Sequence, residues 1–271
     1  METNLKPGDT VELTITSLGS GGEGVGKYQG MAFFVPRGLP GDKLLVTTRK
    51  VKKRYGSGEL SKVLKPSSHR RETHCATFEA GCGGCQWLHL DYQEQLRQKT
   101  NTLRETIKRI GKMSVPVDSI LPAAHMRHYR NKFSMRVDAK GTIGLNRENS
   151  HEVLDLDGCM METRENVQVY TRLKGLKIPR KTNQIHLRSS PDGKVAVCVF
   201  ADEFNDGYVR LEKELRSRCP MLAGFDVKTR KRHHHVGGAK SLSIKVGEIE
   251  YELPSGGFFQ TNYQQAAVLL D

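Results

Sequence analysis

Residues 74–90 read HCATFEAGCGGCQWLHL and place Cys75, Cys82 and Cys85 in the order C-x6-C-x2-C. The C-x2-C spacing lets two thiolates from one tight turn reach the same metal centre, and the glycines at 83 and 84 allow the backbone to wrap closely around it. An all-cysteine ligand shell needs four thiolates, and this segment supplies three. The segment therefore predicts a metal site that a distant fourth cysteine completes.

Three other cysteines are candidates for the fourth ligand. Cys159 is the best of them, because it ends the strand-like run EVLDLDG, where a side chain can be held rigidly. Cys198 lies inside the apolar run KVAVCVFAD, which favours a buried structural thiol, and no comparable argument exists for Cys219. Zinc sites typically pair two C-x2-C turns, and the second is missing here, so the spacing favours an iron–sulfur cluster. Zinc with His74 as an alternative ligand, and cysteines that bind no metal, stay open.

Length and composition exclude several classes of protein. The 271 residues suffice for one large domain or two to three small ones, and 37% are hydrophobic, which excludes a fibrous or wholly disordered chain. No run of about eighteen apolar residues occurs, and the polar start METNLKPGD lacks the apolar core of a signal peptide, so we expect a cytoplasmic protein with no membrane partner. The net charge of +13 favours a polyanionic partner, which makes nucleic acid the first hypothesis.

The first 60 residues predict a small β-barrel. Eleven of the 27 glycines fall there, and short apolar runs at 11–15 and 31–35 lie between glycine-rich turns. Residues 49–71 hold nine basic residues and one acid, Glu59, which indicates either a nucleic-acid surface or a solvated face or linker. Candidates for an RNA-binding face of the barrel are Lys27, Tyr28, Phe33 and Arg37.

Beyond the barrel the pattern predicts a mixture of helices and strands. Residues 91–110 carry apolar side chains at helical spacing with basic ones between them, which predicts an amphipathic helix with a basic outer face, ended by Gly111. Further helices are expected at 162–174, 208–218 and 262–271, and strands at 133–137, 142–145, 153–156, 185–187 and 195–200.

The C-terminal part predicts a hairpin and a final helix. Alternating runs at 242–246 and 249–253 are hinged at Gly247. Residues 230–235, which include three successive histidines, are expected to form a basic, partly disordered loop. No capping glycine or polar tail follows the last helix, so we expect the sequence to be a fragment.

Four phrases together resemble the S-adenosylmethionine-dependent RNA (uracil-5-)-methyltransferase family. GDTVELTI with FVPRGLPGD is similar to the TRAM domain, an OB-like barrel that binds RNA. The cysteine segment follows, then YRNK at 129–132 with GLNRENSHEVLDLDGC at 144–159, and finally FFQTN at 258–262. These phrases stand in the family's order. The resemblance implies a [4Fe-4S] cluster held by Cys75, Cys82, Cys85 and Cys159.

The resemblance also implies roles for other residues. Gln260 would contact the methionine portion of S-adenosylmethionine, and Phe258 would lie near the flipped target base. Substrate-binding residues are expected at Arg130, Lys132, Lys52, Lys53 and Arg54. The family's cysteine nucleophile, in a Cys-Asn-Pro-like motif, and its carboxylate base have no counterpart in these 271 residues, so we expect the chain alone to be inactive.

We therefore expect an α+β multidomain protein. Its parts would be a TRAM barrel (1–66), an iron–sulfur segment with a basic helix (67–111), a central α+β RNA-recognition domain (112–253) and the truncated start of a doubly wound methyltransferase domain (254–271). The expected function is the N-terminal, RNA-recognition part of an enzyme that methylates C5 of uridine in 23S rRNA, because family members that act on tRNA often lack both barrel and cluster. DNA is not an expected partner. The alternatives are a non-catalytic RNA-binding iron–sulfur protein and a zinc-binding barrel protein of the translation machinery.

Overall fold

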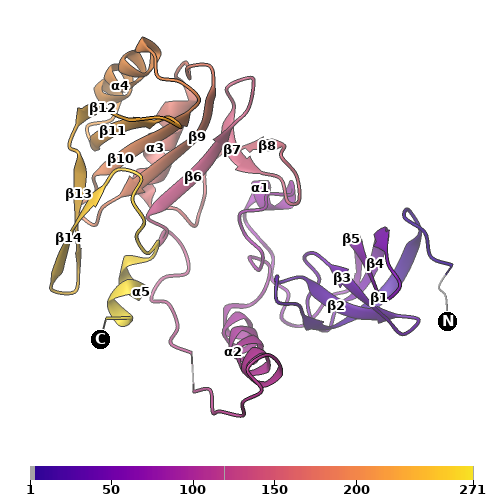
Figure 1. Cartoon of the computed structure of the whole chain (residues 1–271). Helices are drawn as coiled ribbons and strands as arrows, with labels where there is room; N and C mark the ends of the chain where they lie inside the picture. Colours follow the sequence, from indigo (N-terminus) through magenta and orange to yellow (C-terminus); the bar gives the residue numbers. More distant parts are fainter. Residues whose placement is uncertain (1–3, 119, 271) are drawn as a thin grey trace. The chain divides into compact units, whose positions relative to one another are not determined.

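The computed structural model describes residues 4–118 and 120–270, which form two compact units (Figure 1). The first unit comprises residues 1–74 and 85–122, and the second comprises residues 75–84 and 123–271. Both strands and helices are present, so the expected mixed α+β class is confirmed. Throughout the described ranges, every helix is too short or too polar to cross a membrane.

The first unit contains a closed five-stranded barrel, as the glycine-rich sequence predicts. Its strands are β1 (Thr10–Leu18), β2 (Gly24–Tyr28), β3 (Met31–Val35), β4 (Lys43–Val51) and β5 (Tyr55–Lys65), in the order β1-β2-β3-β5-β4. Neighbouring strands are antiparallel except β3 and β5, which are parallel. Alternate residues of β1 and β3 fill the barrel, among them Leu13, Ile15 and Phe33.

Two expectations about the barrel are wrong. The basic stretch 49–71 is no linker, because the end of β4 and all of β5 occupy most of it. Phe33 is fully buried and cannot belong to an RNA-binding face. Its ring fills the space beside β5, where a Cβ added to Gly56 would lie 2.4 Å from it. Glycine at this position therefore lets β5 close the barrel over Phe33.

A buried carboxylate fastens the segment after the barrel to the barrel itself. Asp42 is fully buried and accepts hydrogen bonds from the backbone N–H groups of Leu39 and Ser67, both at 2.8 Å. Arg70 donates to both of its oxygens. Trp87 is tied to the same unit, since its Nε1 donates to the Gly22 carbonyl at 2.8 Å. These bonds hold residues 67–70 and Trp87 against the barrel.

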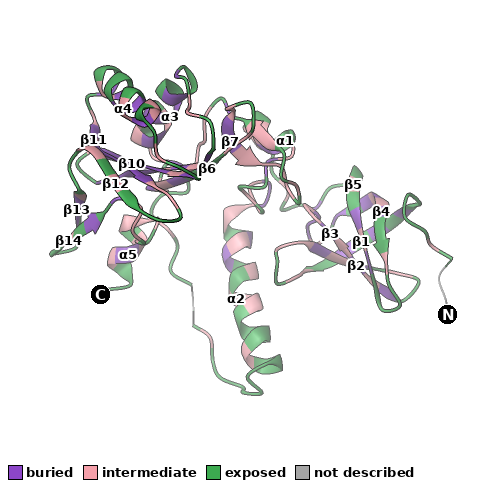
Figure 2. Cartoon of the chain, turned by 45° about the horizontal axis from the view of Figure 1, so that its top comes forward, coloured by how far each residue is buried: buried purple, intermediate pink, exposed green. Residues whose placement is uncertain are grey.

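The predicted basic helix exists as α2 (Tyr92–Arg109), and Asp91 caps its first turn by accepting from the N–H groups of Gln93 and Glu94. Its packing differs from the expected amphipathic arrangement. Only Glu94 and Leu96 are buried, whereas Leu103 is 51% exposed. Figure 2 shows most of the C-terminal half of α2 as exposed. Apolar residues can thus follow a helical spacing although, within the described residues, no other element covers them, as Leu103 shows.

The second unit is built on a seven-stranded sheet. Its order is β12-β11-β10-β9-β6-β7-β8, with only β10 and β11 parallel. The strands are β6 (Lys132–Val137), β7 (Ile143–Asn146), β8 (Val153–Asp155), β9 (Thr182–Ser189), β10 (Val195–Ala201), β11 (Leu222–Lys228) and β12 (His233–Gly238). The strands expected from the sequence are present, and β11 and β12 are additional. The expected disordered histidine loop is wrong, because residues 233–235 pair with β11.

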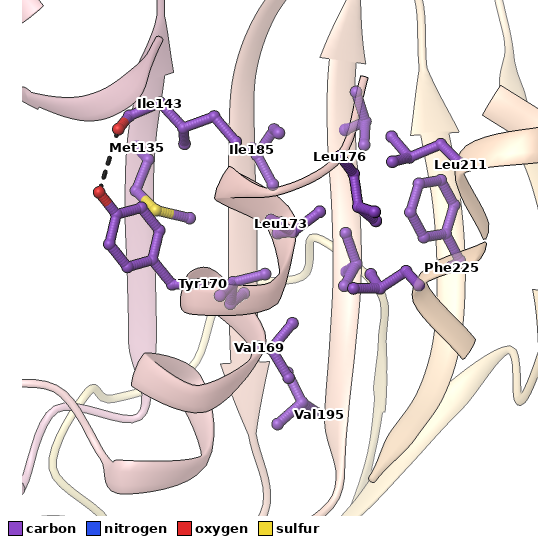
Figure 3. Close-up of a cluster of buried hydrophobic side chains, with 14 of the residues drawn as sticks. Met135, Ile143, Val169, Tyr170, Leu173, Leu176, Ile185, Val195, Leu211 and Phe225 are labelled. Atoms are coloured by element: carbon purple, nitrogen blue, oxygen red, sulfur yellow. Dashed lines mark hydrogen bonds between the residues drawn. The ribbon is translucent and has the colours of Figure 1, made fainter. Parts of the chain in front are cut away.

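Helices cover one face of this sheet. They are α3 (Arg164–Lys174) and α4 (Asp206–Arg218), close to the predicted bounds, and Val169, Leu173 and Leu211 pack on the alternate strand residues that face them. Figure 3 shows the resulting core, in which the Tyr170 hydroxyl donates to the Ile143 carbonyl at 3.1 Å. The opposite face of the sheet carries the intervening, more polar residues.

The remaining elements are short. Helix α1 (Ala76–Glu79) lies in the cysteine segment, and β13 (Ser241–Val246) and β14 (Ile249–Pro254) form the predicted hairpin. The last helix, α5 (Tyr263–Val268), begins at the cap Asn262, whose side chain accepts from the Gln265 N–H at 3.0 Å. Hairpin and α5 share a small core with Ala196 of β10.

We predict that Asp42→Ala destabilises the first unit by about 3 kcal/mol, because Arg70 and two backbone N–H groups lose a buried anionic partner. The fluorescence of Trp87, the single tryptophan of the chain and a member of this unit, reports its urea unfolding. The control is Glu12→Ala, which removes only an exposed pair with Lys43 and should cost less than about 1 kcal/mol. Equal losses for the two variants would contradict the assignment.

Candidate functional site

The FFQTN segment alternates between anchored and exposed side chains. Phe259 is half-buried, with its ring 5.1 Å from the ring of Tyr251 and 5.8 Å from that of Tyr263. Phe258 is 83% exposed, and Gln260 is also exposed. The two side chains expected to meet base and cofactor are therefore the ones that the segment presents to solvent.

Asn131, in the middle of the YRNK phrase, binds this segment directly. Its side-chain Nδ2 donates to the Gln260 carbonyl at 2.9 Å, and its backbone N–H donates to the Thr261 carbonyl at 2.8 Å. Its own carbonyl accepts from the Ser189 N–H at 2.9 Å. Asn131 is fully buried. Two phrases that lie about 130 positions apart in the sequence thus meet through a single residue.

Arg188 and Tyr263 complete the attachment. Arg188 donates to Asn131 Oδ1 at 2.9 Å and to the Gly257 carbonyl at 3.3 Å, while the Tyr263 hydroxyl donates to the Ser189 carbonyl at 2.5 Å. Burial lowers the pKa of Arg188 and raises that of Tyr263 to about 12. Both keep their ordinary protonation at neutral pH, so Arg188 remains a charged donor and Tyr263 a neutral one. We call Asn131, Arg188 and Tyr263 the segment clamp.

The two basic residues that flank Asn131 occupy different surroundings. The backbone of Arg130 bonds to Met161, and its charge lies near the buried carboxyl of Glu162. Burial raises the pKa of Glu162 to about 8, and Arg130 opposes that increase. Lys132 lies on β6 at the sheet face away from the helices, where burial and the neighbouring Arg188 lower its pKa. The YRNK motif predicted roles for both cations. It gave no sign that the asparagine between them holds the FFQTN segment.

The cysteine turn belongs to the second unit as far as Gly84. Cys75 caps α1, with its Sγ accepting from the Phe78 N–H at 3.4 Å, and the Sγ of Cys82 accepts from the Gly84 N–H at the same distance. The Gly83 N–H donates to the Asn146 carbonyl of β7 at 3.0 Å. Backbone N–H groups directed at sulfur stabilise thiolates.

Cys159 lies between β8 and α3 in the same unit. Burial raises the pKa of its thiol, backbone N–H groups of Met161 and Glu162 lower it, and the proximity of Cys75 raises it further. Within the described ranges no three His, Cys, Asp or Glu side chains form a group suited to one metal ion. Cys198 and Cys219 are buried, and burial raises the pKa of Cys198 to about 11.

The barrel presents a basic turn between β4 and β5. Lys52, Lys53 and Arg54 are all exposed there, and the turn is closed by the Lys52 N–H, which donates to the Tyr55 carbonyl at 2.8 Å. Tyr55 is also exposed, and its ring lies edge-on to Phe34 at 6.0 Å. Other cations of the basic stretch form ion pairs, namely Arg49 with Glu59 and Arg70 with Asp42.

Comparison with known proteins assigns the barrel. Residues 4–61 match the TRAM domain. The TRAM barrel of this chain thus includes the basic turn and four of the five strands completely, with β5 matched as far as residue 61.

The relatives found across nearly the whole chain are described as RNA methyltransferases. An uncharacterized RNA methyltransferase of Halalkalibacterium halodurans is 39% identical over 97% of this chain and 63% of its own length, and one of Bacillus anthracis is 30% identical over 99% and 64%. The chain therefore spans slightly less than two thirds of these relatives. Among solved structures, the tRNA (uracil-54, C5)-methyltransferase of Pyrococcus abyssi in complex with S-adenosyl-L-homocysteine shares the fold, with a TM-score of 0.68, 24% identity, and coverage of 96% of this chain and 63% of that one.

We predict that Asn131→Ala releases residues 257–263, because two buried hydrogen bonds are lost and Arg188 is left with an unmet donor; the cost should be about 2–3 kcal/mol. Hydrogen exchange at the amides of Gln265 and Ala266, which the Asn262 cap protects, should accelerate. The matched control Asn183→Ala removes an exposed bond to Asp202 and should leave this exchange unchanged. Unaltered exchange in Asn131→Ala would show that the clamp does not hold the segment.

Proposed function

We propose that this chain is the RNA-recognition part of an S-adenosylmethionine-dependent 23S rRNA (uracil-5-)-methyltransferase. The observation that carries the proposal is the bond from Asn131 to Gln260, which joins the two motifs of the resemblance into one site. The TRAM match, the relatives described as RNA methyltransferases and the shared fold of a uracil-C5 methyltransferase support it. The proposed location is the cytoplasm, with RNA as the partner.

The exposed side chains of FFQTN suit the two ligands of such a reaction. The amide of Gln260 both donates and accepts hydrogen bonds, so it can meet the carboxylate and the ammonium group of the methionine portion of S-adenosylmethionine. The ring of Phe258 offers an open face on which a base taken out of its stack can rest. The clamp fixes the backbone between them, so both side chains keep their position while ligands exchange.

The described residues provide recognition but no nucleophile. Addition to C6 of uracil requires a thiolate, and the two cysteines outside the proposed ligand set, Cys198 and Cys219, are buried with raised pKa values. Methyl transfer to C5 therefore depends on residues other than these.

Cys75, Cys82, Cys85 and Cys159 would hold a [4Fe-4S] cluster. Three of them lie in the second unit, two accept backbone N–H bonds at sulfur, and Cys85 follows Cys82 at the C-x2-C spacing. Such a cluster would supply a covalent link between the α1 turn and the segment before α3.

We predict that the chain binds 23S rRNA transcripts more tightly than tRNA and forms no 5-methyluridine with labelled S-adenosylmethionine. In filter binding, Lys52→Gln with Lys53→Gln should reduce the steepness of the salt dependence by about 1.4, for two lost phosphate contacts. The control is Lys43→Gln with Arg49→Gln, because these cations already pair with Glu12 and Glu59. Failure to bind RNA would refute the function, preference for tRNA would refute the ribosomal substrate, and methyl transfer would refute the absence of a nucleophile.

Purified without oxygen, the chain is predicted to be brown and to contain about four irons. Cys159→Ala should lose most of the iron and the broad visible absorbance. Cys219→Ala removes a buried thiol outside the ligand set and should retain both. A colourless, zinc-loaded protein would overturn the cluster, as would an iron content that Cys159→Ala leaves intact.

A further inference from the structure

The sheet of the second unit has one face that neither helix covers. On strands β6, β9, β10 and β11, the residues that alternate with the core positions point to this face. The hairpin packs over its end near Ala196. His186, Lys132 and the clamp residue Arg188 line a small pocket with residues 253–256 at the end of the hairpin. The uncovered part, which carries Arg136, Phe200 and Lys228, borders this pocket. We call this part the open sheet face.

Its charge is one-sided. The charges of Lys132, Arg136, Arg188 and Lys228 all reach His186, and together with burial they lower the pKa of His186 to about 4. Across the described part of the chain, no carboxylate forms an ion pair with Lys132, Arg136 or Lys228. The one acid nearby, Asp226, is buried, and the rings of His233 and His235 approach its Oδ1 at 3.0 and 3.1 Å. Unpaired cations gathered on one surface require an anionic partner.

The face also carries an aromatic pair. The rings of His186 and Phe200 lie 4.5 Å apart and are inclined at 52°, and both side chains are half-buried. His186 is uncharged at neutral pH because of its lowered pKa, so its ring adds aromatic surface without adding repulsion. Aromatic rings on a sheet, flanked by cations, are the arrangement on which proteins stack the bases of single strands.

We infer that the open sheet face is a second RNA-docking surface, which binds a single-stranded segment through base stacking on Phe200 and phosphate contacts to Arg136 and Lys228. From β6 to β11 the face spans three strand spacings, about 14 Å, enough for a few nucleotides. An acidic peptide would use the cations but not the rings. This inference rests on the proposed function, since it names where the second unit holds the RNA.

The test compares Arg136→Gln with Lys228→Gln against a matched control, Arg172→Gln with Lys213→Gln, which removes two exposed cations from the helices on the other face. The probe is a short single-stranded oligouridylate bound to the full chain. Losing two phosphate contacts should weaken binding about 25-fold at 0.1 M salt and flatten the salt dependence by about 1.4, while the control changes neither. Phe200→Leu should weaken binding about tenfold without altering the salt dependence.

The outcomes separate this inference from the proposed function. If the wild-type chain binds no RNA, the proposed function fails. If it binds and the sheet double variant behaves like its control, only the inference fails. The inference would also be overturned if Phe200→Leu weakened binding of a duplex RNA as much as binding of the oligouridylate, because stacking needs unpaired bases. Thermal unfolding of each variant confirms that it is folded, and Phe200→Leu, which keeps an apolar side chain, guards against a merely structural effect.

Discussion

The second unit depends on the buried amide of Asn131. One side chain donates to the Gln260 carbonyl and accepts from Arg188, while its backbone bonds to Thr261 and Ser189. A buried amide is tolerated only when such bonds are made, because each unmet one costs a large part of its desolvation energy. Asn131 therefore specifies where residues 257–263 must lie. In turn, the segment supplies the carbonyl groups that the N–H groups of Asn131 need as hydrogen-bond acceptors.

Local patterns predicted most of the fold. The apolar run in β1, the hairpin at Gly247 and the helix within 262–271 each follow from short-range rules, and all are present. The sequence failed where a neighbour from elsewhere decides the outcome. Phe33 looked like a surface aromatic, but the glycines of β5 make room for its ring inside the barrel. The histidines of β12 looked like a loop, but pairing with β11 and the carboxylate of Asp226 organise them.

The candidate site was predictable only in part, for the same reason. Spacing identified the cysteine turn, and the family resemblance identified the FFQTN phrase, because each is a short run of neighbouring residues. It gave no reason to connect Asn131 with Gln260, or to select Arg188 from a basic chain of charge +13. Arg188 becomes meaningful only when the register of β6 with β9 sets it opposite Lys132 and beside Asn131. Contacts of this kind depend on sheet register, which a single sequence does not specify.

The fixed backbone of residues 257–263 and the exposure of the Phe258 side chain are related features. Phe258 is 83% exposed while its neighbour Phe259 is packed between two tyrosines. If the backbone were loose, Phe258 could turn inward and bury its ring, since exposed aromatic surface is unfavourable. The clamp prevents this by fixing Gly257 and Gln260 on either side of it. The buried hydrogen bonds thus keep an apolar ring in water, as the proposed contact with a base requires.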